Sequence, residues 1–95
     1  MNVLKQVLGV DVAQKELVVT LGRLNQQLEV ELYSRRKFAN KETGFAALLK
    51  WLKKNTIEGV SLRVVMEATG VYHQKFAYYL DDHQIDLTVV LPNKI

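Results

Sequence analysis

Two acidic residues of this sequence could take part in chemistry because of their type and their position. Asp11 lies inside the apolar run of residues 8–12, and Glu67 directly follows the largely apolar run of residues 62–66. A carboxylate in such a run is costly to bury unless a metal ion, a cation or hydrogen bonds compensate its charge. If both runs are neighbouring parallel strands, ~4.8 Å apart, and both carboxylates end their strands on the same face, they come within reach of one divalent cation. Oxygen ligands without cysteine favour Mg²⁺ or Mn²⁺, which would support phosphoryl transfer.

A structural role explains the same two acids. Glu67 could accept hydrogen bonds from the backbone amides of Thr69 and Gly70 in the following turn. Asp11 could form an ion pair with Lys15. From the residues alone, a metal site and a loop-fixing role for the acids both stay open.

The residues after Glu67 could contact a phosphate. Thr69 and Gly70 precede a predicted helix, whose free amides and dipole favour an anion, and the glycine permits a close backbone approach. An ordinary N-cap is the simpler role for Thr69. We place Tyr72 in the core because it lies on the apolar stripe of that helix, so His73 is the better polar candidate for substrate contact.

A basic run, Arg35-Arg36-Lys37, lies on a predicted edge strand. Across a phosphate backbone it would give salt-sensitive affinity that does not depend on base sequence. Protection of the strand edge from aggregation explains the same charges. The net charge of +3 permits a polyanionic partner without requiring one.

The composition fits one small domain over residues 1–95. The 95 residues are 48% hydrophobic, which can supply one core, and cysteine is absent, which excludes disulfides and thiolate metal sites. No apolar run is long enough to span a bilayer, and the N-terminus lacks the features of a signal peptide. We therefore expect a cytoplasmic protein with no membrane partner.

The hydrophobic pattern predicts an α/β fold with a mixed five-stranded sheet in the order β-β-β-α-β-α-β. The first three strands form an antiparallel meander, and strands one and four lie side by side in parallel. Asn40 is the predicted N-cap of the first helix, while Trp51 lies off its apolar stripe and is expected at a contact surface. The strands are predicted over residues 5–11, 16–21, 28–38, 62–66 and 86–91, and the helices over residues 41–54 and 71–83.

Two segments at the expected separation resemble motifs of the DEDD transposases of bacterial insertion sequences, which include the Piv-type invertases. Residues 9–15, Gly-Val-Asp-Val-Ala-Gln-Lys, are similar to the N-terminal motif. Residues 64–73, Val-Val-Met-Glu-Ala-Thr-Gly-Val-Tyr-His, are similar to the second and more specific motif. The resemblance covers essentially the whole chain as the N-terminal part of a longer protein. One departure is Leu91 before Pro92, where a polar residue is expected.

The resemblance implies an RNase H-like, RuvC-type catalytic domain that binds Mg²⁺ (or Mn²⁺) and cleaves and transfers DNA strands. Asp11 and Glu67 correspond to the first two of four acids. The other two belong to a later helix beyond Ile95, so the sheet is expected to be truncated before its last helices and Asp81, Asp82 and Asp86 are not candidates.

The resemblance also implies several properties of the longer protein. These are bacterial origin, a later domain with a serine nucleophile, a structured guide RNA and a homo-oligomeric state. We expect Lys15, Thr69, Gly70, His73, Arg35 and Arg36 to face nucleic acid. Half a carboxylate set holds Mg²⁺ weakly, so residues 1–95 alone are expected to be inactive.

Two other classes of function remain as alternatives. One is a non-catalytic nucleic-acid-binding or assembly module in which the acids only fix loops. The other is an actin-like or sugar-kinase-like ATPase half-domain, whose glycine-rich phosphate hairpin finds no counterpart in Val12-Ala13-Gln14.

Overall fold

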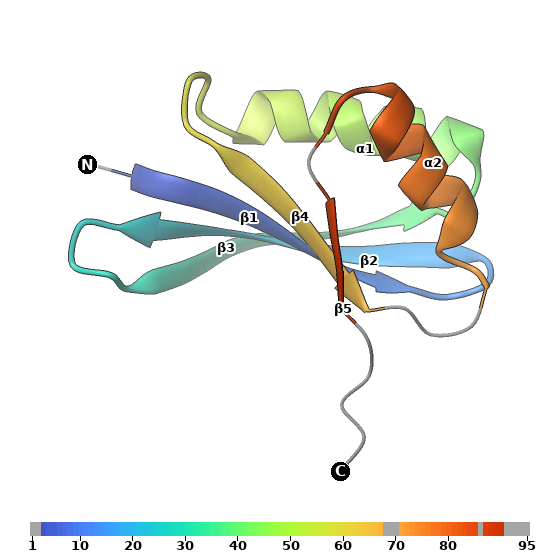
Figure 1. Cartoon of the computed structure of the whole chain (residues 1–95), viewed down its shortest axis with the longest axis horizontal. Helices are drawn as coiled ribbons and strands as arrows, with labels where there is room; N and C mark the ends of the chain where they lie inside the picture. Colours follow the sequence, from blue (N-terminus) through green and yellow to red (C-terminus); the bar gives the residue numbers. More distant parts are fainter. Residues whose placement is uncertain (1–2, 68–70, 86, 91–95) are drawn as a thin grey trace, which may run out of the picture.

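The computed structural model describes residues 3–67, 71–85 and 87–90, and this part of the chain has the predicted order of elements (Figure 1). Predicted and observed boundaries agree to within a few residues at most element ends. Thr69, Gly70, Asp86 and Leu91 lie outside the described residues. The elements are β1 (Val3–Val12), β2 (Glu16–Asn25), β3 (Val30–Ala39), α1 (Glu42–Asn55), β4 (Leu62–Glu67), α2 (Gln74–Asp82) and β5 (Leu87–Val90).

The strands form one mixed sheet in the order β3-β2-β1-β4-β5. β1 pairs with β2, and β2 with β3, in antiparallel ladders, whereas β4 runs parallel to both β1 and β5. The predicted meander, the parallel neighbours β1 and β4, and the edge position of β3 are therefore confirmed.

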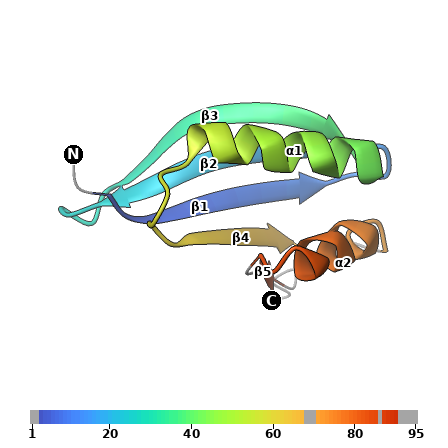
Figure 2. The same cartoon turned by 90° about the horizontal axis from the view of Figure 1, so that it is seen from above.

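The core lies between one face of the sheet and the two helices (Figure 2). Alternation along β1 buries Leu8 and Val10 on this face and leaves Asp11 on the other. Phe45 from α1 contacts Phe76 from α2, with ring centroids 5.2 Å apart, so both helices share one core. Neither described helix is long and apolar enough to cross a membrane.

The solvent exposure of two aromatic side chains differs from the prediction. Trp51 is only 8% exposed and packs against Phe38 from the edge strand, with ring centroids 5.7 Å apart, so it is a core residue. Tyr72 is 46% exposed. The reason is that α2 begins at Gln74, so Tyr72 lies in the preceding turn and not on the helical stripe.

The junction between β3 and α1 also differs from the prediction. The N-cap of α1 is Lys41, with extended backbone and no side-chain cap hydrogen bond, and Asn40 uses its side chain elsewhere. The helix starts so close to the strand that a Cβ atom on Gly44 would overlap the backbone of Ala39. A glycine early in this helix therefore permits close packing of α1 on the end of β3.

The β2–β3 hairpin explains why the third strand starts later than predicted. Leu28 has a φ of +62°, in the left-handed region, so it belongs to the turn and β3 begins at Val30. The Asn25 side chain accepts hydrogen bonds from the backbone amides of Gln27 and Glu29, both at 3.0 Å. These bonds fix the turn that Leu28 completes.

Candidate metal and nucleic-acid site

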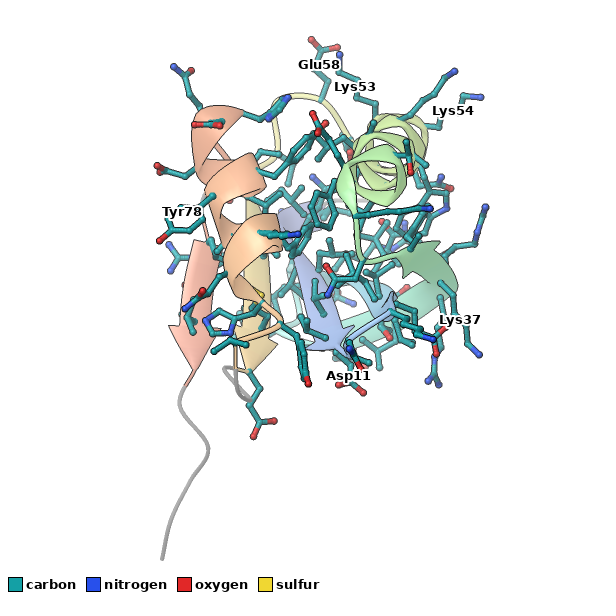
Figure 3. All side chains as sticks on the ribbon, turned by 90° about the vertical axis from the view of Figure 1, so that its right-hand side faces the viewer. Asp11, Lys37, Lys53, Lys54, Glu58 and Tyr78 are labelled. Atoms are coloured by element: carbon teal, nitrogen blue, oxygen red, sulfur yellow. The ribbon has the colours of Figure 1, made fainter. Side chains whose placement is uncertain are left out.

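Asp11 and Glu67 lie beside each other at the carboxyl ends of two parallel strands. The β1–β4 ladder ends with the pair Val10 and Met66, so each acid is the next residue after the last pair. Val10 and Met66 are buried beneath the helices, and alternation therefore turns both carboxylates to the opposite, uncovered face, the one that neither described helix covers. Figure 3 shows Asp11 at the end of β1, on the side of the molecule away from α1.

The two acids line one shallow hollow of about 380 Å³ on the uncovered face. The sequence pattern suggested that Asp11 is buried at a cost in free energy. Both side chains are exposed, so this cost does not arise. Gly9 and Thr20, which lie opposite each other in the β1–β2 ladder, also line the hollow, and Thr20 pairs with Arg35 of β3. The hollow is lined by Gly9, Val10, Asp11, Val18, Thr20, Arg35 and Glu67.

The donor atoms of this hollow fit a hydrated divalent cation. Mg²⁺ prefers oxygen ligands and usually keeps several waters, so two exposed carboxylates are sufficient for a partial site. Within the described residues, no group of three or more His, Asp or Glu side chains could hold a metal ion. Among the residues that line this hollow, the candidate metal ligands are Asp11 and Glu67.

The basic run on β3 divides between the two faces of the sheet. Arg35 lines the hollow beside the acids, in a position to contact an anionic substrate. The guanidinium of Arg36 lies over the Phe38 ring, 5.6 Å from its centroid, and Arg36 is not among the residues that line the hollow. Of the two arginines predicted to contact nucleic acid, only Arg35 therefore lies beside the acids.

The other predicted contacts lie outside the hollow. Lys15 is exposed in the β1–β2 turn, and in the described part of the chain it forms no ion pair with Asp11. His73 is half-buried immediately before α2, and its Nδ1 atom is buried without a hydrogen-bond partner among the described residues. The predicted contacts of Thr69 and Gly70 fall outside the described residues.

Asn40 is the residue near the site whose role the sequence did not indicate. Its side-chain amide donates hydrogen bonds to the Ala13 carbonyl at 2.8 Å and to the Tyr72 carbonyl at 3.0 Å. The Ala13 carbonyl comes after Asp11 in the chain, and the Tyr72 carbonyl comes after Glu67. An asparagine before a helix is typical of an N-cap, and nothing local distinguishes that role from a long-range bridge.

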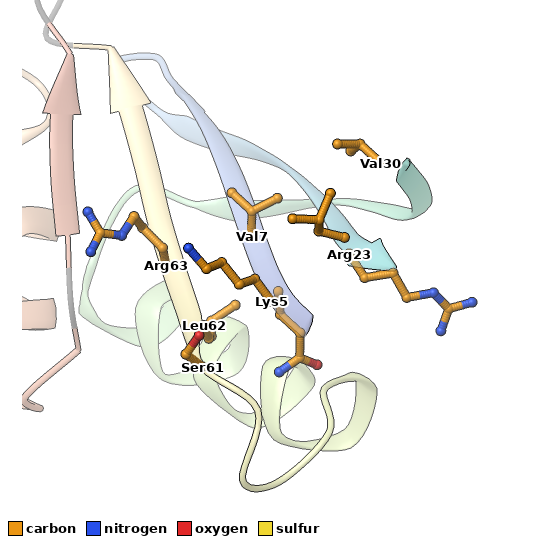
Figure 4. Close-up of a pocket in the computed structure, with 9 residues that line it drawn as sticks. Lys5, Val7, Arg23, Val30, Ser61, Leu62 and Arg63 are labelled. Carbon is orange, nitrogen blue, oxygen red and sulfur yellow. The ribbon is translucent and has the colours of Figure 1, made fainter. Parts of the chain in front are cut away.

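A second hollow, of about 580 Å³, lies at the opposite end of β1 from the acids (Figure 4). Three of its lining residues are cations, and Arg23 forms an ion pair with Glu31 at 3.4 Å. Arg63 donates a hydrogen bond to the Thr88 hydroxyl at 3.1 Å. Neither acid lines it, so the two hollows are separate features.

The fold is similar to those of solved Holliday junction resolvases. The Holliday junction resolvase of fowlpox virus, solved with its substrate Holliday junction DNA, superposes with a TM-score of 0.67 at 13% identity, over 95% of this chain and 62% of that one. RuvC of Thermus thermophilus, in complex with Holliday junction substrate, superposes with a TM-score of 0.59 at 14% identity, over 92% of this chain and 66% of that one. The chain has an RNase H-like, RuvC-type fold.

Sequence comparison identifies the family to which the chain belongs. Residues 8–95 match the IS110-type DEDD transposases, a family described as transposase, and the chain belongs to this family. The pilin gene-inverting protein of Moraxella lacunata is 31% identical over 55 residues. That match covers 58% of this chain and 17% of the relative, so the chain spans a small part of that protein's length.

Proposed function

We propose that this chain forms part of the catalytic domain of a DNA transposase or recombinase, in which Asp11 and Glu67 are two of the acids that hold a divalent metal ion. One observation carries the proposal. The two carboxylates end adjacent parallel strands and line the same hollow on the uncovered face of the sheet. Membership of a transposase family supports the assignment of the hollow to DNA cleavage.

The proposed chemistry assigns a role to each group in the hollow. Asp11 and Glu67 hold Mg²⁺ (or Mn²⁺), which, when bound, supplies the Lewis acidity that phosphoryl transfer needs. Arg35, exposed in the same hollow, binds the DNA backbone, because a guanidinium pairs with phosphate oxygens. Two carboxylates hold Mg²⁺ weakly, so the proposal includes further ligands from the longer protein.

The remaining contacts of the proposal rest on the sequence pattern and on the family. Lys15, Arg36, Thr69, Gly70 and His73 face nucleic acid in the full-length protein. A structured guide RNA and assembly into a homo-oligomer complete the proposed set of partners.

DNA cleavage by the full-length protein tests the proposal. Asp11→Asn and Glu67→Gln should each lower Mg²⁺-dependent cleavage by about 100-fold or more, because even residues that only orient metal ligands change activity by about 10–100-fold. Glu58→Gln is the matched control, since Glu58 is an exposed glutamate in the loop before β4, outside the hollow. Unchanged cleavage in either acid variant would refute the proposal.

A truncated protein tests the proposed division of the acids. Residues 1–95 alone should not nick DNA, because they contribute two of the four proposed acids. Robust Mg²⁺-dependent nicking by this chain, abolished in Asp11→Ala, would contradict that division.

The same variants separate the proposal from a non-catalytic nucleic-acid-binding or assembly module. In such a module the acids only fix loops, so Asp11→Asn and Glu67→Gln would leave metal binding and function unchanged. The ATPase alternative needs a glycine-rich phosphate hairpin after the first acid, and the turn from Ala13 to Lys15 has no glycine.

A further inference from the structure

The two acids lie just beyond the hydrogen bonds that join their own strands. The β1–β4 ladder stops at Val10 and Met66, so it does not fix the distance between the residues that follow. Asp11 remains paired with Val18 of β2. A connection beyond the ladder is therefore needed to hold the two strand ends together.

Asn40 supplies that connection. Both acceptors of its side-chain NH₂ group are backbone carbonyls, one from each side of the acid pair. Ala13 is two residues after Asp11, and Tyr72 is five residues after Glu67. One amide group thus joins the turn that follows β1 to the turn that precedes α2.

Asn40 is itself held by the surrounding backbone. Its N–H donates a hydrogen bond to the Lys15 carbonyl at 3.0 Å, and its neighbour Ala39 pairs with Glu16 at the end of the β2–β3 ladder. On the other side, Gly44 brings the first turn of α1 against Ala39. The amide therefore projects from a junction that a strand ladder and a helix both fix.

We propose that Asn40 is a positioning residue for the acid pair, and that its side-chain amide sets the separation of Asp11 and Glu67 by joining the two turns that follow them. The metal-binding part of this inference rests on the proposed function, whereas the joining of the turns does not. Asn40→Asp keeps the shape of the side chain but replaces the donor by a carboxylate oxygen that faces two carbonyls, so it should act like Asn40→Ala.

Mn²⁺ binding to the 95-residue chain, followed by NMR line broadening, tests the effect on the acids. Asn40→Ala and Asn40→Asp should weaken Mn²⁺ binding by about tenfold at a temperature where each variant is folded. Asn55→Ala is the matched control, because the Asn55 side chain makes the same kind of bond to the Trp51 carbonyl, at 2.8 Å, at the far end of α1. Equal Mn²⁺ affinity in wild type and both Asn40 variants would overturn the proposal.

Backbone ¹⁵N relaxation in metal-free protein tests the joining of the turns directly. Without the amide, residues 13–15 and residues 71–73 should both become more mobile, whereas the Asn55 variant should leave both turns unchanged. If both turns keep their wild-type relaxation in Asn40→Ala and Asn40→Asp, the inference is wrong. If the turns loosen but wild type binds no Mn²⁺, the proposed metal site fails and the structural bridge stands, so the two failures are distinguishable.

Discussion

Gln6 should be essential for stability although it is a polar residue in the core. Its side chain is 2% exposed on the helix-covered face of β1. Its amide nitrogen donates to the carbonyls of Ile57 at 3.2 Å and Val60 at 3.1 Å, and its oxygen accepts from the Ile57 amide at 2.6 Å. These bonds fix the loop that leads into β4, the strand that carries Glu67.

Gln6→Met keeps the length of the side chain and removes all three hydrogen bonds. Each bond contributes about 1 kcal/mol net, and the loop groups left without a partner are costly to bury. We expect the free energy of unfolding to fall by about 2–4 kcal/mol, which lowers Tm by about 10–25 °C in a domain of this size.

Urea unfolding of the two proteins measures this loss. Gln26→Met is the matched control, because Gln26 is exposed in the hairpin turn, and it should change stability by less than about 0.5 kcal/mol. If Gln6→Met is as stable as wild type, the hydrogen bonds to the loop contribute nothing and an apolar residue suffices at this position.

Three further predictions concern backbone conformation and pH. Gly44→Ala should destabilise the protein by about 2 kcal/mol or more in urea unfolding, because the new Cβ overlaps the Ala39 backbone; wild-type stability would contradict the close approach of α1. Leu28→Gly should raise the free energy of unfolding by about 0.5–1 kcal/mol, because leucine is disfavoured at a φ of +62°, and a loss of stability would show that the exposed side chain contributes contacts. Burial raises the pKa of Tyr33, against the opposing charge of Arg23, so the folded state favours the neutral phenol. The stability that this preference contributes is present below about pH 10 and is lost as the pH rises further. Tyr33→Phe should therefore lose less stability than wild type between pH 9 and pH 11, roughly the range around the ordinary tyrosine pKa. Parallel curves of unfolding free energy against pH for the two proteins would refute this.

The parts of the fold that depend on local periodicity were predicted from the sequence. The element order indicated that β1 and β4 are parallel neighbours, whereas a shared face for Asp11 and Glu67 was a condition of the metal hypothesis. The structure confirms the parallel pairing and meets the condition, because the period of two along each strand turns both acids away from the buried Val10 and Met66.

The remaining features depend on packing between distant segments. Trp51 is buried because β3 brings Phe38 against α1, and Tyr72 is exposed because α2 starts one turn later than the apolar pattern indicated. The bridge from Asn40 to Tyr72 joins residues 32 positions apart, so no local pattern could distinguish it from a helix cap. Arg35 and Arg36 were grouped by sequence, and strand alternation separated them.

Paramagnetic broadening by Mn²⁺ tests the central claim, that Asp11 and Glu67 together form a metal site, most directly. In ¹⁵N-labelled protein, the broadening should centre on the amides of residues 9–12 and 65–67, and it should disappear in both Asp11→Asn and Glu67→Gln. Glu58→Gln should leave it unchanged. Broadening that survives in both acid variants, or that centres on Asp81 and Asp82 of α2, would contradict the account.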